Sequence, residues 1–184
     1  MQRDTRSQKF PLGSGMPGFS LPNVDGRTLG NDFFQGAKAA LVVFTCNHCP
    51  YVRGSEQMLI EIVRKFESRG LKTLSISAND AEQYPEDSFE KMKEHAQQLK
   101  LPYPYLYDES QQVARAFDAA CTPECFLFDA DMRLVYQGAL TDRPKDLGAA
   151  RQDFLSPAIE AALQGAKPRP DFNHPIGCSI KWRN

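Results

Sequence analysis

Short apolar runs in this chain alternate with longer segments in which apolar residues recur at helical spacing. The run 39–45 is apolar up to its final threonine and predicts a buried strand, and the run 71–77 predicts a second strand. From Pro50 onward, apolar positions recur with a helical period until Gly70. We therefore expect a helix between the two strands, ended by this glycine.

The rest of the pattern predicts shorter elements around this unit. They are an extended piece at 16–22, a hairpin with an Asp-Gly turn at 24–27, a helix from Pro85 to about Lys100, a strand at 105–107, a helix capped by Ser110 and running through Phe117, strands at 125–128 and 134–137, and a helix at 151–164 before Gly165. The order is β-α-β-α-β-α-β-β-α, which predicts an α/β fold with one mixed sheet and helices on both faces.

Three segments follow from this reading. Residues 1–15 are expected to be a flexible lead-in, residues 16–165 the folded domain, and residues 166–184 an extended tail. The tail holds three prolines, which disfavour a helix, and it carries Ile176, Ile180 and Trp182, through which it can dock on the domain.

Composition narrows the class of protein. With 184 residues, 41% of them hydrophobic, the chain is long enough for one well-buried core. A formal net charge of -1 gives no reason to expect nucleic acid or an acidic membrane as a partner. There is no apolar run long enough for a membrane span, and the polar start predicts no secretory signal. A cytoplasmic location is therefore expected.

Five cysteines in a chain of this kind favour reduced or cycling thiols over permanent bridges. Two of them form Cys46-Asn47-His48-Cys49-Pro50 at the first strand-to-helix junction. Free backbone N–H groups and the helix dipole are expected there to stabilise the thiolate of an exposed Cys46. Cys49, one turn inward, would then resolve a mixed disulfide formed on Cys46.

A Cys-x-x-Cys at this junction, with Thr122-Pro123 before a later strand, resembles the thioredoxin fold. More narrowly, Pro-x-Phe-x-Leu at 17–21 and the hairpin resemble the redoxin branch, the alkyl hydroperoxide reductase and thiol-specific antioxidant (AhpC/TSA) superfamily. Gly177-Cys178-Ser179-Ile180-Lys181-Trp182 is similar to the ending of bacterial thioredoxin-like and peroxiredoxin-like proteins. The resemblance covers about residues 16–165 and implies a redox-active disulfide with a role in antioxidant defence and cell redox homeostasis.

The resemblance also implies roles for residues around the pair. Pro123 would be cis and face the cysteines, and Thr122 would offer its backbone to an extended substrate in a groove that Thr45 also borders. His48 resembles the histidine of Cys-x-His-Cys oxidases and isomerases, which predicts a reduction potential above thioredoxin's roughly -270 mV and nearer to about -180 mV. A solvated histidine with no tuning role is the alternative.

The other cysteines leave two readings each. Cys121 is a candidate auxiliary thiol that approaches Cys46, or a small buried hydrophobe. Cys178, in the tail, is a candidate thiol that exchanges with Cys46 or Cys121, or a residue that only packs. Cys125 precedes Phe126-Leu127-Phe128 and is expected in the core.

The sequence thus predicts a thiol-disulfide oxidoreductase that cycles Cys46 and Cys49. It needs no cofactor, but it needs a thiol electron donor or acceptor and a protein or small-molecule disulfide or peroxide as substrate. A thiol peroxidase is the main alternative, although the Pro-x-x-x-Thr-x-x-Cys spacing of peroxiredoxins is broken here. Arg53 and Arg143 are the arginines that could support a thiolate in that case.

The cysteines and histidines also allow a metal-binding function as an alternative. A zinc site of Cys46, Cys49, Cys121 and Cys125 lacks the usual ribbon spacing, and Pro50 stands where a haem attachment motif requires histidine. A copper chaperone would use the cysteine pair with a distant His95 or His174, but the pair is one residue closer than in such relatives. We therefore expect no metal, and the intact Cys-x-x-Cys disfavours a pure interaction module. Redox direction, substrate and oligomeric state stay open.

Overall fold

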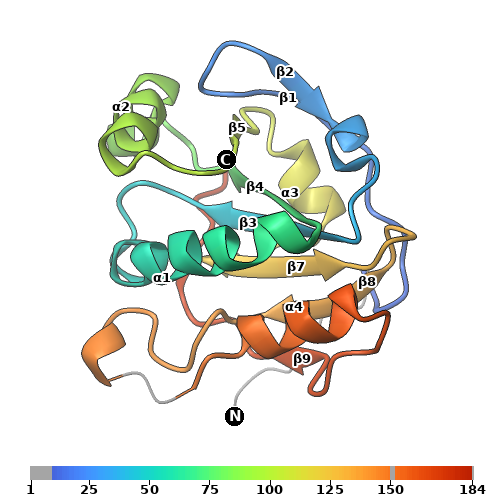
Figure 1. The fold of residues 1–184 in the computed structure, drawn as a ribbon. Helices are drawn as coiled ribbons and strands as arrows, with labels where there is room; N and C mark the ends of the chain where they lie inside the picture. Colours follow the sequence, from blue (N-terminus) through green and yellow to red (C-terminus); the bar gives the residue numbers. More distant parts are fainter. Residues whose placement is uncertain (1–9, 150–151, 184) are drawn as a thin grey trace.

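A mixed sheet with strand order β5-β4-β3-β7-β8-β9 forms the centre of the computed structural model, which describes residues 10–149 and 152–183 (Figure 1). Its strands are β3 (Ala39–Thr45), β4 (Leu71–Ser77), β5 (Tyr105–Tyr107), β7 (Glu124–Phe128), β8 (Leu134–Gly138) and β9 (Phe172–Asn173). Two smaller sheets pair β1 (Ser20–Pro22) with β2 (Thr28–Gly30) and β6 (Cys121–Thr122) with β10 (Cys178–Ser179). The α-helices are α1 (Pro50–Phe66), α2 (Phe89–Leu99), α3 (Gln112–Ala116) and α4 (Leu155–Leu163). The predicted α/β thioredoxin-like fold with an N-terminal hairpin is confirmed.

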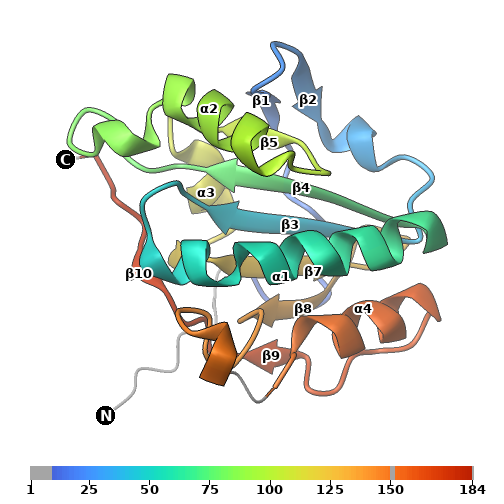
Figure 2. The ribbon, with the colours of Figure 1, turned by 60° about the vertical axis from the view of Figure 1, so that its left-hand side comes forward.

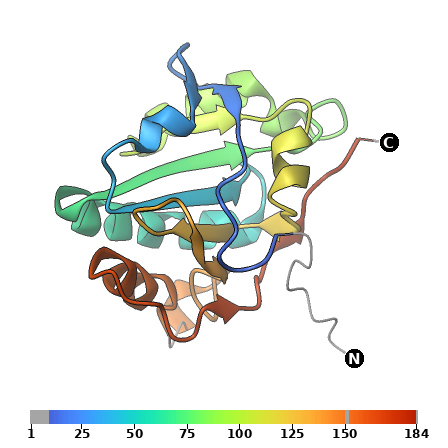
Figure 3. The ribbon, with the colours of Figure 1, turned by 90° about the vertical axis from the view of Figure 1, so that its right-hand side faces the viewer.

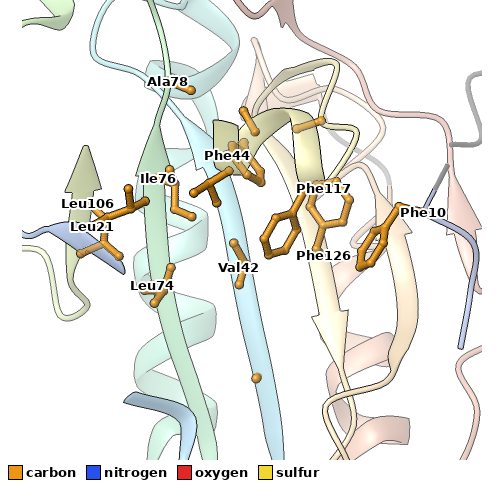
Figure 4. Close-up of a cluster of buried hydrophobic side chains, with 14 of the residues drawn as sticks. Phe10, Leu21, Val42, Phe44, Leu74, Ile76, Ala78, Leu106, Phe117 and Phe126 are labelled. Atoms are coloured by element: carbon orange, nitrogen blue, oxygen red, sulfur yellow. The ribbon is translucent and has the colours of Figure 1, made fainter. Parts of the chain in front are cut away.

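Both faces of the sheet are covered, because β3 is apolar on both sides. On one face, Val42 and Phe44 pack in a buried cluster with Phe117, the residue that follows α3 (Figure 4). Leu41 and Val43 face the other way and pack with α1 and α4. Figure 3 shows α3 and the N-terminal segment on the face opposite α1. The central strand is thereby fixed on both sides, which gives its carboxyl end a defined position for the cysteines that follow.

The second predicted helix begins later than expected. Pro85–Asp87 forms a 3-10 turn, and Ser88 is extended with ψ 155 before α2 starts at Phe89. The Ser88 hydroxyl accepts the N–H of Lys91 at 3.4 Å and so caps the helix. The prediction of a helix from Pro85 was wrong because Asp87 turns away from the helix into the interior, where it has no exposed surface.

Two further helix starts also differ from the prediction. The N-cap of α3 is Gln111, with φ 62, instead of Ser110, and the carboxylate of Asp108 accepts the N–H of Ala114 at 2.8 Å. The last helix begins at Leu155, after Asp153 has accepted the N–H of Ser156 at 2.9 Å. Arg151, where this helix was expected to start, lies outside the described residues.

Residues 10–15 belong to the folded domain, so the predicted flexible lead-in was wrong for them. The Phe10 ring is buried, with its centroid 5.6 Å from that of Phe117. The N–H of Gly13 donates to the Leu134 carbonyl at 2.8 Å, and the N–H of Leu134 donates to the Ser14 carbonyl at 2.9 Å. This added edge pairing explains the order of the segment. The rest of the lead-in, residues 1–9, lies outside the described residues.

The C-terminal tail lies on the domain and passes the N-terminal end of α1 (Figure 2). Its strand β9 runs parallel to β8, and β10 runs antiparallel to β6. Ile180 is buried in the same cluster as Phe44, and the N–H of Lys181 donates to the side chain of Asn79 at 2.9 Å. The tail is therefore part of the surroundings of the cysteine pair. None of the described helices is long and apolar enough to cross a membrane.

Candidate active site

The cysteine pair lies between the end of β3 and the start of α1. Cys49 is the N-cap of α1, and Pro50, which has no N–H to satisfy, is its first residue. Both thiols are buried, since Cys46 is 1% exposed and Cys49 is 0% exposed. The expectation of an exposed first thiol was therefore wrong, because the loop and the tail pack around both sulfur atoms.

Thr122 contacts both sulfur atoms of the pair. Its hydroxyl oxygen lies 3.5 Å from the Sγ of Cys46, and its carbonyl accepts the S–H of Cys49 at 3.3 Å. The following Thr122-Pro123 peptide bond is cis. The residue before this proline thus holds both thiols with its side chain and its backbone.

The two thiols share their protons. The hydrogen bond between the sulfur atoms raises the pKa of Cys46 and lowers the pKa of Cys49 to about 4. The Cys178 thiol and the N–H groups of Val52 and Cys178 also lower the pKa of Cys49. At neutral pH the reduced pair should therefore hold one proton and one negative charge, shared between the two sulfur atoms.

A buried carboxylate that the sequence analysis missed organises the loop between the cysteines. Asp87 has no exposed surface, and its Oδ1 accepts the N–H groups of Asn47 at 2.7 Å and of His48 at 3.2 Å. Its Oδ2 accepts the side-chain amide of Asn79 at 2.8 Å. The N–H groups expected to be free beneath Cys46 are thus bound to Asp87. The sequence Pro85-Glu86-Asp87 looks like an exposed helix start, so nothing in it indicates that Asp87 is buried.

His48 is directed at this carboxylate and not at a thiol. Its Nδ1 lies 2.5 Å from the Oδ2 of Asp87, and its ring stacks on that of Tyr84 with centroids 5.4 Å apart. His48 is therefore paired and stacked and not merely solvated, and its tuning role stays a prediction. After the contact with Cys49 and burial, the charge of Asp87 further raises the pKa of Cys46. His48 and Cys46 thus both lie near the same buried carboxylate.

Further hydrogen bonds hold Asn47, the first residue between the cysteines. The Tyr105 hydroxyl donates to its Oδ1 at 2.9 Å, and the Arg53 Nε donates to its carbonyl at 2.9 Å. Its side-chain amide donates to the Glu86 carbonyl at 2.8 Å. The guanidinium of Arg53 is therefore hydrogen-bonded to the backbone of this loop. Among the described hydrogen bonds, it contacts neither thiol.

The other residues predicted for the site lie at different places around it. Thr45 is buried, and with Pro123 and residues of α1 it lines a small cavity, so its predicted part in a substrate groove or in tuning the thiols stays a prediction. Cys125 is buried in the cluster beneath α1, as expected for a core residue. Cys121 neighbours Thr122 on β6, and successive residues of a strand point to opposite faces, which directs it away from the face that holds Cys46. Burial raises the pKa of Cys121.

One group of side chains in the described part of the chain could bring ligand atoms to a metal. Atoms of Cys46, His48 and Asp87 lie within 4.8 Å of one another. Both oxygens of Asp87 and the Nδ1 of His48 already bond within the protein, so a metal would have to displace these contacts. The four-cysteine zinc set is not gathered among the described residues, and His95 is paired with Glu56 at 2.8 Å.

The arrangement described above is a dithiol at a helix start beside a cis-proline loop. A family model of the AhpC/TSA family matches residues 12–137. The chain belongs to this family. Among solved structures, this AhpC/TSA protein is similar to an uncharacterized conserved protein from Geobacillus kaustophilus, with 42% identity, a TM-score of 0.87 and coverage of 95% of this chain and 93% of the other.

Two curated relatives of this AhpC/TSA protein are named for thiol chemistry. Peroxiredoxin Q of Oryza sativa subsp. japonica is 26% identical over 107 residues, which make up 58% of this chain. The match covers 46% of the length of that relative. The thiol-disulfide oxidoreductase ResA of Bacillus thuringiensis is 19% identical over 72% of each chain. The family is therefore one of thiol-based redox proteins, acting on peroxides or on disulfides.

Proposed function

We propose that this protein is a thiol-disulfide oxidoreductase that cycles Cys46 and Cys49 between a dithiol and a disulfide. The observation that carries this proposal is that both sulfur atoms, at the start of α1, contact Thr122: the Sγ of Cys46 lies 3.5 Å from its hydroxyl oxygen, and the Sγ of Cys49 lies 3.3 Å from its carbonyl oxygen. The two cysteines also share one buried cluster, which is the arrangement that a Cys46–Cys49 disulfide requires. The cycle needs no cofactor, but it requires a thiol donor or acceptor and a disulfide substrate.

The exchange itself is a pair of displacement steps. A thiolate of the pair attacks a substrate disulfide and forms a mixed disulfide, and one substrate sulfur leaves as a thiolate. The second sulfur of the pair then attacks the first, which closes the Cys46–Cys49 bridge and releases the other substrate sulfur. The Thr122 hydroxyl lies beside Cys46 and lowers the pKa of this thiol, which assists it when it must carry the charge.

A thiol peroxidase is the second candidate. The likeness to peroxiredoxin Q favours it, as does a hydroxyl group of Thr122 within 3.5 Å of the Cys46 sulfur. Against it stand the broken peroxiredoxin spacing and the contact of the Arg53 Nε with the Asn47 carbonyl. Peroxide turnover is therefore expected to be slow.

One comparison separates the two candidates. The fully reduced protein and its Cys46→Ser and Cys49→Ser variants are given hydrogen peroxide or glutathione disulfide, and the products are mapped by mass spectrometry with a sulfenate trap. We expect rapid formation of the Cys46–Cys49 bridge with glutathione disulfide and slow loss of peroxide. Rapid stoichiometric peroxide loss with a trapped sulfenate would reassign the protein to the peroxidases.

A further inference from the structure

We propose that Cys178 is a third redox thiol through which the buried pair exchanges its disulfide with partner proteins. The inference rests on the proposed function, because it requires the Cys46–Cys49 disulfide. It adds the order in which the three sulfur atoms act. Cys178 is the entry and exit point, Cys49 is the middle, and Cys46 is the inner end.

Contact and exposure both support this order. Cys178 packs against the cluster of Cys46, Cys49 and Val52, and of the pair it is Cys49 whose pKa the Cys178 thiol lowers. Cys178 is half-buried, whereas Cys46 and Cys49 are 1% and 0% exposed. Cys49 therefore shares its cluster with both other cysteines, and of these three residues Cys178 is the one with exposed surface for a partner to reach. The sequence alone predicts exchange of Cys178 with Cys46 or Cys121 instead.

The fold holds Cys178 at this place. In the antiparallel pairing of β10 with β6, Cys178 lies opposite Thr122, and directly opposite residues lie on the same face. That face is the one that holds the cysteine pair, since the Thr122 hydroxyl contacts Cys46. The N–H of Ile180 donates to the Ala120 carbonyl at 3.1 Å. Pairing and burial of Ile180 thus fix the register of the tail.

Gly177 allows the tail to approach so closely. A Cβ at this position would lie 2.0 Å from the carbonyl oxygen of Thr122, so a side chain cannot be accommodated without a shift. The backbone of Thr122 was expected to receive an extended substrate, but it is already paired with the tail. An incoming chain would have to displace β10 to pair there, and the tail cysteine occupies the place where a substrate cysteine would lie.

The proposed steps balance without an added oxidant. In the oxidised protein the Cys178 thiolate attacks the Sγ of Cys49, the Cys46–Cys49 bond breaks, and Cys46 leaves as a thiolate that takes up a proton. A partner dithiol then attacks Cys178, and Cys49 leaves as a thiolate. The second partner thiol closes the partner's disulfide and releases Cys178. The partner loses two electrons, which the protein gains; the reverse order reduces a partner disulfide.

The charge of the pair suits this order. Burial and then the contact with Cys49 raise the pKa of Cys178 to about 11 in the reduced protein. Once Cys49 is in a disulfide it carries no charge, so it no longer raises the pKa of Cys178. Lys181 and Lys145 act in the opposite direction and lower the pKa of Cys178. Cys178 is thus a better nucleophile when the pair is oxidised, which is when the relay needs it.

The first experiment traps the intermediate. The Cys46→Ser variant is oxidised with one equivalent of diamide, quenched with acid, alkylated and mapped by mass spectrometry. We expect a Cys49–Cys178 disulfide as the main product. A Cys49 that stays reduced, or that bridges only to Cys121 or to a second chain, would overturn the proposal.

The second experiment measures rates. Oxidised wild type and the Cys178→Ser, Cys178→Ala and Ser179→Ala variants are reduced by thioredoxin, a protein dithiol, and by dithiothreitol. We expect both Cys178 variants to slow reduction by thioredoxin about tenfold and reduction by dithiothreitol less, because a small thiol reaches buried sulfur more easily. Ser179→Ala, the exposed neighbour on β10, should match wild type.

The outcomes separate the two proposals. Equal rates for wild type and both Cys178 variants would refute the relay while leaving the Cys46–Cys49 cycle intact. A wild-type protein that forms no Cys46–Cys49 disulfide would refute the proposed function itself. Melting curves of each variant show whether a slower rate comes from loss of the fold.

Discussion

The Nδ1 of His48 lies 2.5 Å from the Oδ2 of Asp87, and this contact joins the loop between the cysteines to a turn 39 residues further along the chain. Asp87 is wholly buried and also accepts the N–H groups of Asn47 and His48. A buried carboxylate is tolerated only when donors surround it, so the loop and the turn order each other. The position of the cysteine pair therefore depends on Asp87.

Replacing Asp87 with asparagine is expected to change both redox properties and stability. The charge of Asp87 raises the pKa of Cys46, although less than the Cys49 contact and burial do, so its removal should lower that pKa and raise the reduction potential. Loss of the charged acceptor should cost about 1–3 kcal/mol of unfolding free energy. Equilibration with glutathione buffers gives the potential, and guanidinium unfolding gives the stability.

Glu86→Gln is the matched control for this variant. Glu86 is next to Asp87 in the sequence, but its carboxylate is exposed. An Asp87→Asn protein with the potential and stability of the control would contradict the role given to the buried carboxylate. The wild-type potential, expected above that of thioredoxin, stays a prediction. His48 pairs with Asp87, so the Asp87→Asn variant also removes the charged partner of His48.

The strands β3, β4 and β5 were predicted to the residue because they are short apolar runs with clear ends. The position of the cysteine pair at a helix start followed from the same pattern. Burial of an acidic residue leaves no such mark: Asp87 stands in a polar segment and its partners are far away in the chain. Phe10 was missed for a related reason, since a single aromatic residue in a polar segment has no periodicity.

The site was predictable in its residues but not in its electrostatics. Cys46, Cys49, Thr122 and Pro123 are gathered as the resemblance implied. How the charge is distributed between the two sulfur atoms depends on contacts that only the folded chain provides, first the contact between Cys46 and Cys49 and, after burial, the approach of Cys178. Pairing of a two-residue strand in the tail with β6 is a tertiary contact that no local pattern of the sequence encodes.

The reduced protein is expected to become more stable as the pH rises from about 4 to about 9. The hydrogen bond from Cys46 lowers the pKa of Cys49 to about 4, below its ordinary value of 9.0. A group whose pKa is lowered on folding stabilises the fold fully above its unfolded pKa and loses this effect as the pH falls through the folded value. Guanidinium unfolding of the reduced protein at about pH 5 and about pH 8 measures the change.

Cys49→Ser is the reference for this measurement, and the stability gain should be smaller in it. The raised pKa of Cys46 acts in the opposite sense and destabilises the fold only above about pH 9. If the reduced wild type and Cys49→Ser changed equally with pH, the lowered pKa of Cys49 would be wrong.

The potential should fall with pH by about 30 mV per unit near neutrality. One proton accompanies two electrons when the reduced pair is a monothiolate, and a tenfold change in the equilibrium of a two-electron couple is about 30 mV. Potentials measured in glutathione buffers at several pH values give this slope. A slope of about 60 mV per unit would mean that both thiols are protonated at neutral pH.

Phe10→Ala is expected to destabilise the domain by about 3 kcal/mol, because a buried aromatic side chain is lost next to Phe117. The control is Leu12→Ala, since Leu12 is 40% exposed and its loss should change the unfolding free energy by less than about 0.5 kcal/mol. Chemical denaturation followed by circular dichroism measures both. Equal stability of the two variants would support the original prediction that residues 10–15 are a flexible lead-in.

Gly177→Ala should move the tail away from the cysteine pair. The added Cβ meets the Thr122 carbonyl oxygen at 2.0 Å, and relief of this overlap requires β10 to shift, at a cost of about 1–3 kcal/mol. Cys178 should then react faster with an alkylating reagent, and in the Cys46→Ser background the yield of the Cys49–Cys178 disulfide should fall.

Gly18→Ala provides the control, since a Cβ there meets nothing within 4 Å. Its melting temperature and Cys178 reactivity should match those of wild type. Were Gly177→Ala to form the Cys49–Cys178 disulfide in full yield, the close approach of the tail to Thr122 would not be what brings the third thiol to the pair.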